Sequence, residues 1–359
     1  DPNGNGIADE VPMTGYIGGL ATDPTNWLVN AFVENNNPLS NTNPTVAAGL
    51  VINDGKIEYS PMSEGYKKAM EYIHKLYAEG LLDNQTFTQD STQFTSLLDN
   101  EGANLVAVHA GGAPQVDGTH FWSNTDGPWQ NWAVFSPVEG PDGVRFSVMG
   151  LNNYFASCQG VVSANCKYPE IAVALFDFLC NTEPSIVQSC GPEGLGWDYT
   201  TEGVGLDGNP PVYEKHAIPD DYDWLGNGYK SDYGKNYYWA SDATIGCGTK
   251  AFRASQRVED PDKGEGFLQK AAEQYSEFAP DESTIVPNLV FEGQDAQVIS
   301  EGTLTIGGYV NQACVQFITG DLDVEKDWDT YIEKLNAMGV ENYIATYQKA
   351  YDTYMANLK

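Results

Sequence analysis

Positive charge is scarce in this sequence, which has 18 Lys and Arg residues against 50 Asp and Glu residues and a formal net charge of −32 over 359 residues. A duplex-binding surface needs clustered cations to displace phosphate counterions, and an anionic membrane surface also attracts basic segments. The composition therefore argues against nucleic acid and against an anionic membrane as partners. Long apolar runs are absent too, since no stretch approaches the roughly 20 residues of a membrane span.

Metal-binding and catalytic motifs are equally scarce. The six cysteines and four histidines form no CxxC pair, which argues against a zinc site of the finger or ribbon type. The motifs GxSxG, HExxH and GxGxxG and a P-loop are all missing. Acid clusters such as Asp220, Asp221 and Asp223 could serve a glycosidase, but fifty acidic residues produce such clusters by chance.

The remaining composition is that of a folded protein, with 41% hydrophobic and 12% aromatic residues. The length allows a large core and about two domains. The cysteines fit either an exported protein with disulfides or buried free thiols, and both interpretations stay open.

Local patterns predict an α/β architecture with a largely parallel sheet. Asp54 and Gly55 suit the tight turn of a hairpin over residues 51–59. The apolar run 105–108 predicts a strand buried on both faces, which leads into a loop of small residues at 109–114. Because ligands of parallel sheets bind beyond the carboxyl ends of the strands, we expect a site at this loop or at the segment before Phe155.

Several helices are also predicted. Ser60 is the expected cap of the first one, with Pro61 at its first position and Gly80 at its end. A second helix begins at Pro169, and its apolar stripe is expected to be buried. The residues of that stripe are Ile171, Ala174, Leu175, Phe178 and Leu179. Two further stripes at the C-terminus predict a helix that carries Trp328 and stops at Gly339, and another after it.

The most specific motif is Asp1-x-Asn3-x-Asn5-Gly6-x-x-Asp9-Glu10. Oxygen side chains at alternate positions can surround a hard cation, and a glycine at the sixth position permits the sharp turn. An EF-hand loop ends in a bidentate Glu at position 12, where this chain has Pro12, so Glu10 would have to supply that ligand. The pattern predicts a structural calcium site, and the alternative is a cluster of Asx turns without metal.

Aromatic residues in irregular segments are the second signal. The chain has 8 Trp and 21 Tyr residues, and Trp27, Trp129, Trp132 and Trp239 lie in segments rich in Gly, Pro and Asn. Indole rings in loops can stack on the apolar faces of sugars while Asn, Asp and Gln bind the hydroxyl groups. The alternative is that these rings anchor loops or belong to small cores.

Three stretches carry a resemblance to a known family. They are the calcium-loop segment 1–12, the segment Cys158-Gln-Gly-Val-Val-Ser-Ala-Asn-Cys-Lys-Tyr-Pro-Glu170 with its helix, and the closing segment from Phe317-Ile-Thr-Gly320 to Tyr354. Together they resemble the family 1 extracellular solute-binding proteins of ABC importers. The likeness is closer to the long lipoprotein-type members, which include the alginate-binding periplasmic proteins.

The resemblance implies a two-lobe, periplasmic-binding-protein-like (type II) α/β fold with C-terminal helices. Residues 1–150 resemble second-lobe sequence with the calcium loop. Residues 151–285 resemble a returning first-lobe segment with an irregular aromatic-rich region, and 286–359 resemble the hinge-spanning C-terminal helices. The family's opening, with a lipobox cysteine and most of the first lobe, has no counterpart here, so the first lobe is expected to be incomplete in this chain.

The resemblance also implies sites. The family's calcium ligands would fall on Asp1, Asn3, Asn5, the carbonyl of Ile7, Asp9 and Glu10. Candidate ligand-binding residues in the interlobe cleft follow from their positions and are Trp27, His109, Trp129, Trp132, Tyr154 and Trp239.

The implied function is that of a non-enzymatic, monomeric substrate-binding component of a bacterial ABC importer. It would capture a solute, with an oligosaccharide as the first ligand class, and deliver it to the permease subunits. The implied location is the extracellular cell surface, through a lipid anchor on a segment absent from this chain, or the periplasm. The alternatives are a secreted, calcium-stabilised glycoside-active enzyme and a surface adhesion module that uses calcium for rigidity.

Overall fold

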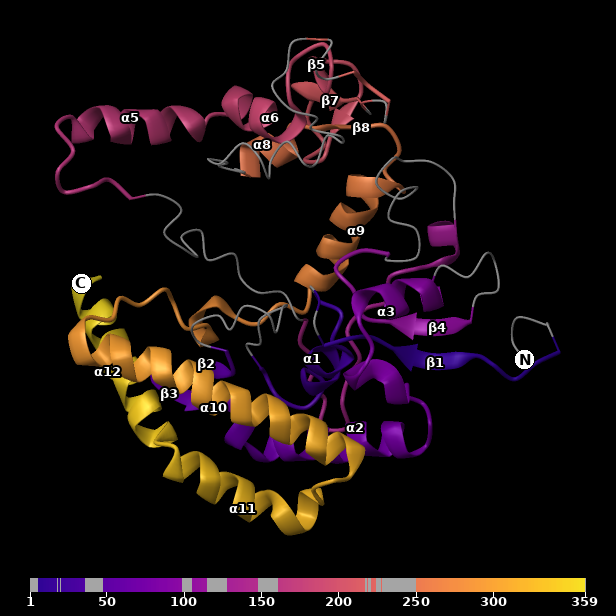
Figure 1. Cartoon of the computed structure of the whole chain (residues 1–359), viewed down its shortest axis with the longest axis vertical. Coiled ribbons are helices and arrows are strands. Elements are labelled where there is room, and N and C mark those ends of the chain that lie inside the picture. The colour runs from indigo at the N-terminus through magenta and orange to yellow at the C-terminus, as the bar shows by residue number, and fades with distance from the viewer. Residues whose placement is uncertain are drawn as a thin grey trace. The chain divides into compact units, whose positions relative to one another are not determined.

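The computed structural model divides into two compact units (Figure 1). Unit 1 comprises residues 1–118, 126–156 and 271–359, and unit 2 comprises 119–125 and 157–270. The residues that the structure describes are 6–17, 19, 21–35, 48–98, 105–114, 128–147, 161–216, 218, 221–223, 227 and 250–358. The three-part domain boundaries expected from the sequence are not tested by this division into two units and stay a prediction.

Unit 1 is a mixed α/β body. Its elements are β1 (Val11–Thr14), α1 (Pro24–Val29), β2 (Leu50–Asn53), β3 (Lys56–Tyr59), η1 (Ser60–Met62), α2 (Glu64–Ala78), η2 (Asn84–Phe87), α3 (Ser91–Leu98), β4 (Val106–His109), η4 (Pro128–Asn131), η5 (Glu282–Thr284), α10 (Gly293–Thr319), α11 (Val324–Ala337) and α12 (Val340–Asn357). The end of α9 (Gly264–Ser276) also belongs to it.

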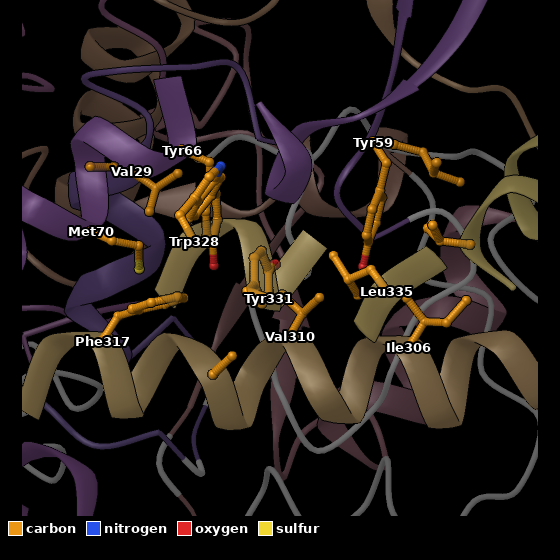
Figure 2. Packing of buried hydrophobic residues seen from close by; sticks show 14 of the residues in the cluster. Val29, Tyr59, Tyr66, Met70, Ile306, Val310, Phe317, Trp328, Tyr331 and Leu335 are labelled. Carbon is orange, nitrogen blue, oxygen red and sulfur yellow. The ribbon is translucent and has the colours of Figure 1, made fainter. Parts of the chain in front are cut away.

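The core of unit 1 lies between α2, the C-terminal helices and the β2–β3 hairpin. Figure 2 shows the rings of Phe317, Trp328 and Tyr331 gathered at α10, with centroids 5.1 to 5.9 Å apart. The helices approach closely because α10 carries Gly302, where a Cβ would overlap the ring of Tyr343 on α12. The two C-terminal stripes predicted from the sequence are therefore confirmed as core faces.

The predicted hairpin is confirmed. Strands β2 and β3 pair antiparallel, with Asn53 opposite Lys56. Asp54 and Gly55 between them have φ values of 47° and 78°, which are the left-handed values that a primed two-residue turn requires.

The first long helix begins later than predicted. Ser60 and Pro61 belong to the short 3-10 turn η1, and the cap of α2 is Ser63, whose Oγ accepts from the backbone N–H of Tyr66 at 3.1 Å. Both serines precede an apolar-periodic run, so the pattern alone could not distinguish them.

Strand pairing differs from the expected largely parallel sheet. Among the described residues, β1 and β4 form a parallel pair, whereas β2–β3, β5–β7 and β6–β8 are antiparallel pairs. In β4 only Val106 is buried, so the prediction of a strand buried on both faces was wrong.

Unit 2 is smaller and holds short elements. They are α5 (Pro169–Leu179), α6 (Thr182–Cys190), β5 (Trp197–Tyr199), β6 (Val204–Gly205), β7 (Tyr213–Lys215), α8 (Lys250–Ala254), β8 (Arg257–Val258) and most of α9. Its buried cluster consists of Ile186, Cys190, Trp197 and Tyr213, and Phe252 packs against it.

Helix α5 begins at Pro169 as predicted, but its apolar stripe is not buried. Ile171, Leu175 and Phe178 are 63%, 49% and 60% exposed. Apolar residues lie all round this helix, so its periodicity could not show which side, if any, is covered.

The described cysteines, Cys166, Cys180, Cys190 and Cys314, are free thiols, while Cys158 and Cys247 lie outside the described residues. Within the described part of the chain, no helix is long and apolar enough to cross a bilayer.

Candidate functional site

The candidate site begins where the parallel strands β1 and β4 end. Their register pairs Val11 with Val106 and Thr14 with His109, so the last residues of both strands lie side by side (Figure 1). The loop of small residues after His109, where the sequence predicted a site, leaves the sheet at this edge.

The segment after β1 folds back on itself. The backbone N–H of Tyr16 donates to the carbonyl of Thr22 at 2.9 Å, and the Thr22 hydroxyl donates to the carbonyl of Tyr16 at 2.7 Å. Asp23 then caps α1 by accepting from the N–H of Thr25. This fold-back needs Gly15, since a Cβ there would overlap the Thr22 carbonyl oxygen.

Four rings from separate segments meet beside the strand ends. This aromatic cluster consists of Tyr16, Phe94, His109 and Trp132. The His109 ring lies edge-on to Trp132, with centroids 4.6 Å apart and planes at 74°, and 6.0 Å from Phe94. The Tyr16 ring contacts Phe94, with centroids 5.2 Å apart. Phe94 is buried, and the other three rings are partly exposed.

A buried polar network supports the cluster. Thr14 donates from its hydroxyl to Asp83 at 2.8 Å and accepts from the Gln89 amide at 3.0 Å. The same amide group of Gln89 donates to the carbonyl of Gly15 at 2.6 Å. Thr14 is fully buried, so these bonds fix the end of β1 and the start of the fold-back.

His109 is neutral at physiological pH. Burial lowers the pKa of its imidazole, because desolvation penalises the charged ring. Its Nδ1 lies 3.2 Å from the carbonyl oxygen of Ala110, which can only accept, so we assign the proton of the neutral ring to Nδ1. The Nε2 atom is then left as an acceptor.

The structure places the other predicted site residues as follows. Trp27 lies on α1, donates from Nε1 to the carbonyl of Ala21 at 2.9 Å and contacts Tyr275 at 5.5 Å. Trp129 is only 3% exposed, in the turn η4 before Trp132. Tyr154 and Trp239 lie outside the described residues.

Sequence reasoning missed Tyr16, Phe94, Thr14 and Gln89. Tyr16 directly follows a strand, which is a usable signal. Phe94 lies on an ordinary amphipathic helix, and its contact with His109 depends on packing that no local pattern encodes.

The calcium motif is described only in part, since Asp1, Asn3 and Asn5 lie outside the described residues. Gly6 has φ +82°, the left-handed conformation that the sharp turn of such a loop needs. Ile7, Asp9 and Glu10 lead directly into β1. The described residues contain no group of three or more His, Cys, Asp or Glu side chains placed to hold a metal.

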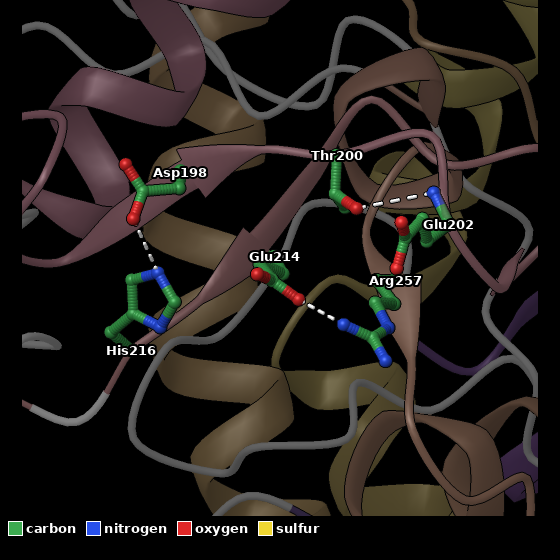
Figure 3. Close-up of polar contacts among 6 residues, drawn as sticks. All are labelled: Asp198, Thr200, Glu202, Glu214, His216 and Arg257. Atoms are coloured by element: carbon green, nitrogen blue, oxygen red, sulfur yellow. Dashed lines mark hydrogen bonds and ion pairs between the residues drawn. The ribbon is translucent and has the colours of Figure 1, made fainter.

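Unit 2 has a separate set of polar contacts on its strands (Figure 3). His216 Nε2 lies 2.9 Å from the Asp198 carboxylate, and Arg257 on β8 pairs with Glu214 on β7. Each of these pairs joins neighbouring segments, which indicates a role in holding the small strands together.

Comparison with known proteins identifies the fold. The chain is 23% identical to the fructooligosaccharide ABC transporter substrate-binding protein FusA of Streptococcus pneumoniae, over 99% of this chain and 60% of FusA. An extracellular solute-binding protein of Bifidobacterium longum subsp. infantis superposes with a TM-score of 0.69 and 20% identity, over 99% of this chain and 67% of that one. The chain has the fold of the extracellular solute-binding proteins.

Two further structures share this solute-binding fold. An EF-hand mutant of S. pneumoniae FusA in complex with fructo-nystose has a TM-score of 0.62 and 17% identity, over 99% of this chain and 66% of that one. The alginate-binding protein AlgQ2 without calcium ion has a TM-score of 0.56 and 16% identity, over 96% and 64%. No family model matches the chain. The solute-binding α/β fold predicted from the sequence is thus confirmed, and the chain spans about 60% of the length of FusA.

Proposed function

We propose that this chain is the substrate-binding component of an ABC importer that captures an oligosaccharide and delivers it to permease subunits. The solute-binding fold supports this proposal, as does the similarity to FusA, which is named for fructooligosaccharide transport. A protein with this function is located outside the cell or in the periplasm. We propose specifically that it is held at the membrane by a lipid anchor on a further segment.

The observation that carries the proposal is the aromatic cluster at the carboxyl ends of β1 and β4. Partly exposed rings of Tyr16, His109 and Trp132 stand beside the buried polar network of Thr14 and Gln89. Rings supply apolar faces on which sugars stack, and polar groups fixed next to them orient hydroxyl groups. We propose His109, Trp132 and Trp27 as ligand contacts, and Trp129, Tyr154 and Trp239 stay predicted contacts.

In this role the protein binds its ligand without transforming it. The proteins with this fold described above are substrate-binding proteins. The candidate site is suited to binding, because the rings of His109 and Trp132 are in edge-to-face contact and offer apolar faces to a sugar. The described residues offer no specific support for a glycoside-active enzyme. Asp221 and Asp223 lie on an irregular segment, and Asp220 lies outside the described residues.

We also propose a structural calcium ion at the amino-terminal loop, held by Asp1, Asn3, Asn5, the carbonyl of Ile7, Asp9 and Glu10. The conformation of Gly6 fits such a loop. The FusA structure described as an EF-hand mutant and the calcium-free AlgQ2 structure connect calcium with proteins of this fold. An ion here would supply charge that holds the oxygen ligands together and would fix the chain just before β1.

The test is a panel of purified oligosaccharides, read by thermal unfolding and by tryptophan fluorescence. A ligand that binds only the folded state raises the melting temperature by mass action, and a sugar stacked on Trp132 or Trp27 changes the fluorescence. His109→Phe and Trp132→Leu should abolish both responses, while Tyr72→Phe on the exposed face of α2 should keep them. If no saccharide on a broad panel changes either signal, the proposed function is wrong.

A further inference from the structure

Two polar atoms of the aromatic cluster lack partners among the described residues. The Nε1 of Trp132 is buried from solvent and donates to none of them. The Nε2 of His109 is an acceptor, because Nδ1 carries the proton toward the Ala110 carbonyl. The two rings are in direct edge-to-face contact, so a donor and an acceptor are both available within one small site.

This pair of atoms is complementary to hydroxyl groups. A hydroxyl donates one hydrogen bond and accepts two, so sugar hydroxyls can accept from Trp132 Nε1–H and donate to His109 Nε2. An ionised carboxylate only accepts. It could satisfy Trp132, but it would face the His109 lone pair without a proton to share. Protonation of His109 would repair this mismatch only at the cost of charging a ring that is largely shielded from water.

The distribution of charge along the sequence is consistent with this. The aromatic cluster and its supporting polar network lie in segments 1–55 and 76–144, and neither segment contains a Lys or an Arg. The next cation along the chain, Arg145, lies over the Phe278 ring at 3.8 Å and donates to the Pro137 carbonyl. The charged member of the supporting network is the carboxylate of Asp83, which accepts from Thr14.

We infer that the aromatic cluster takes an uncharged sugar residue, held by hydroxyl groups at His109 Nε2 and Trp132 Nε1, and that it rejects sugars carrying a carboxylate. This inference rests on the proposed function and specifies its substrate class. It separates this chain from the alginate-binding protein of the same fold, because alginate is a polymer of carboxylated sugars. Specificity in this proposal comes from the contacts and also from the lack of Lys and Arg in the segments that form the cluster.

The experiment compares one sugar skeleton in two charge states by titration calorimetry. A neutral oligosaccharide that binds the wild-type protein is oxidised at its primary hydroxyl groups to the corresponding uronate. We expect the uronate to bind at least about tenfold more weakly, because its carboxylate has no proton to donate to His109 Nε2 and leaves that buried acceptor unpaired. Most of that difference should persist at about 1 M salt, where the screening length is only about 3 Å and the field of the whole acidic chain is suppressed.

Variants separate the two hydrogen bonds. Trp132→Phe keeps an aromatic ring but removes the donor, and we expect about a tenfold loss of affinity for the neutral sugar, the size of one net hydrogen bond. His109→Gln restores an acceptor and should bind better than His109→Phe. Tyr72→Phe is the matched control, and it should leave both affinities unchanged.

The outcomes are distinguishable. Equal or tighter binding of the uronate would overturn the inference and leave the proposed function standing. A difference that vanishes at high salt would assign the discrimination to the overall charge of the chain and would also overturn it. If no saccharide binds, the proposed function itself is wrong.

Discussion

At the scale of the residue, His109 makes the site sensitive to pH. Burial lowers the pKa of its imidazole below the unfolded value of about 6.5. The groups packed against it, Phe94, Trp132 and its strand partner Thr14, do not titrate, and Asp83 is the carboxylate of the adjoining network. The unfolded chain therefore binds a proton at this position more readily than the folded chain does.

The predicted consequence is a loss of both stability and ligand affinity in acid. The stability that neutral His109 contributes is fully present above a pH of about 6.5 and is lost as the pH falls through the lower folded pKa. Chemical unfolding at a series of pH values should show a steeper decline below a pH of about 6.5 in the wild type than in His109→Phe. Glu34, whose pKa is raised mainly by burial, changes stability in the opposite direction and is common to both proteins. Parallel pH profiles of the two proteins would contradict the assignment.

Residue-scale predictability was uneven at this site. The loop after β4 was foreseen because a strand followed by small residues is a local pattern, and His109 came with it. Tyr16, Phe94 and Gln89 were not foreseen, because their role arises from contacts between segments far apart in the sequence.

At the scale of the element, the approach of α10 to α12 depends on one glycine. Gly302→Ala should destabilise the protein by about 1–3 kcal/mol, because the new methyl group overlaps the Tyr343 ring. Gly307→Ala on the same helix has open space around its Cβ and should stabilise by about 0.5–1 kcal/mol through helix propensity. Denaturant unfolding of both variants measures the difference, and equal effects would contradict the packing described for α10.

A second element-scale prediction concerns the proposed calcium loop before β1. Calcium should raise the melting temperature, and a chelator should reverse the gain, with about 2.7 kcal/mol of stabilisation expected at a hundredfold excess over the dissociation constant. Asp9→Ala should abolish the response, whereas Asp221→Ala in unit 2 should keep it. If calcium leaves the melting temperature of the wild-type protein unchanged, the loop is an Asx-turn cluster without metal.

Elements were predictable where local chemistry sufficed. The Asp54-Gly55 turn and the stripes of α11 and α12 follow from turn preference and helical period. The start of α2 and the burial of α5 did not follow. For α2, both Ser60 and Ser63 precede the apolar periodic run, so either could be the cap. For α5, an apolar stripe in the sequence does not show whether another element covers it.

At the scale of the whole molecule, the acidic composition and the solute-binding fold indicate the same class of ligand. A net charge of −32 argues against nucleic-acid and anionic-membrane partners, and the solute-binding fold directs attention to the ends of β1 and β4. An uncharged ligand is the class for which this charge carries no long-range electrostatic penalty. The central claim is that the protein carries an oligosaccharide without changing it.

Native mass spectrometry of the protein incubated with neutral oligosaccharides tests that claim most directly, because it reads the mass of what is bound. The account predicts a one-to-one complex whose added mass equals the intact saccharide and stays the same through prolonged incubation. It also predicts that the complex is lost in His109→Phe. A complex that carries shortened saccharide, or a protein that carries none, would contradict it.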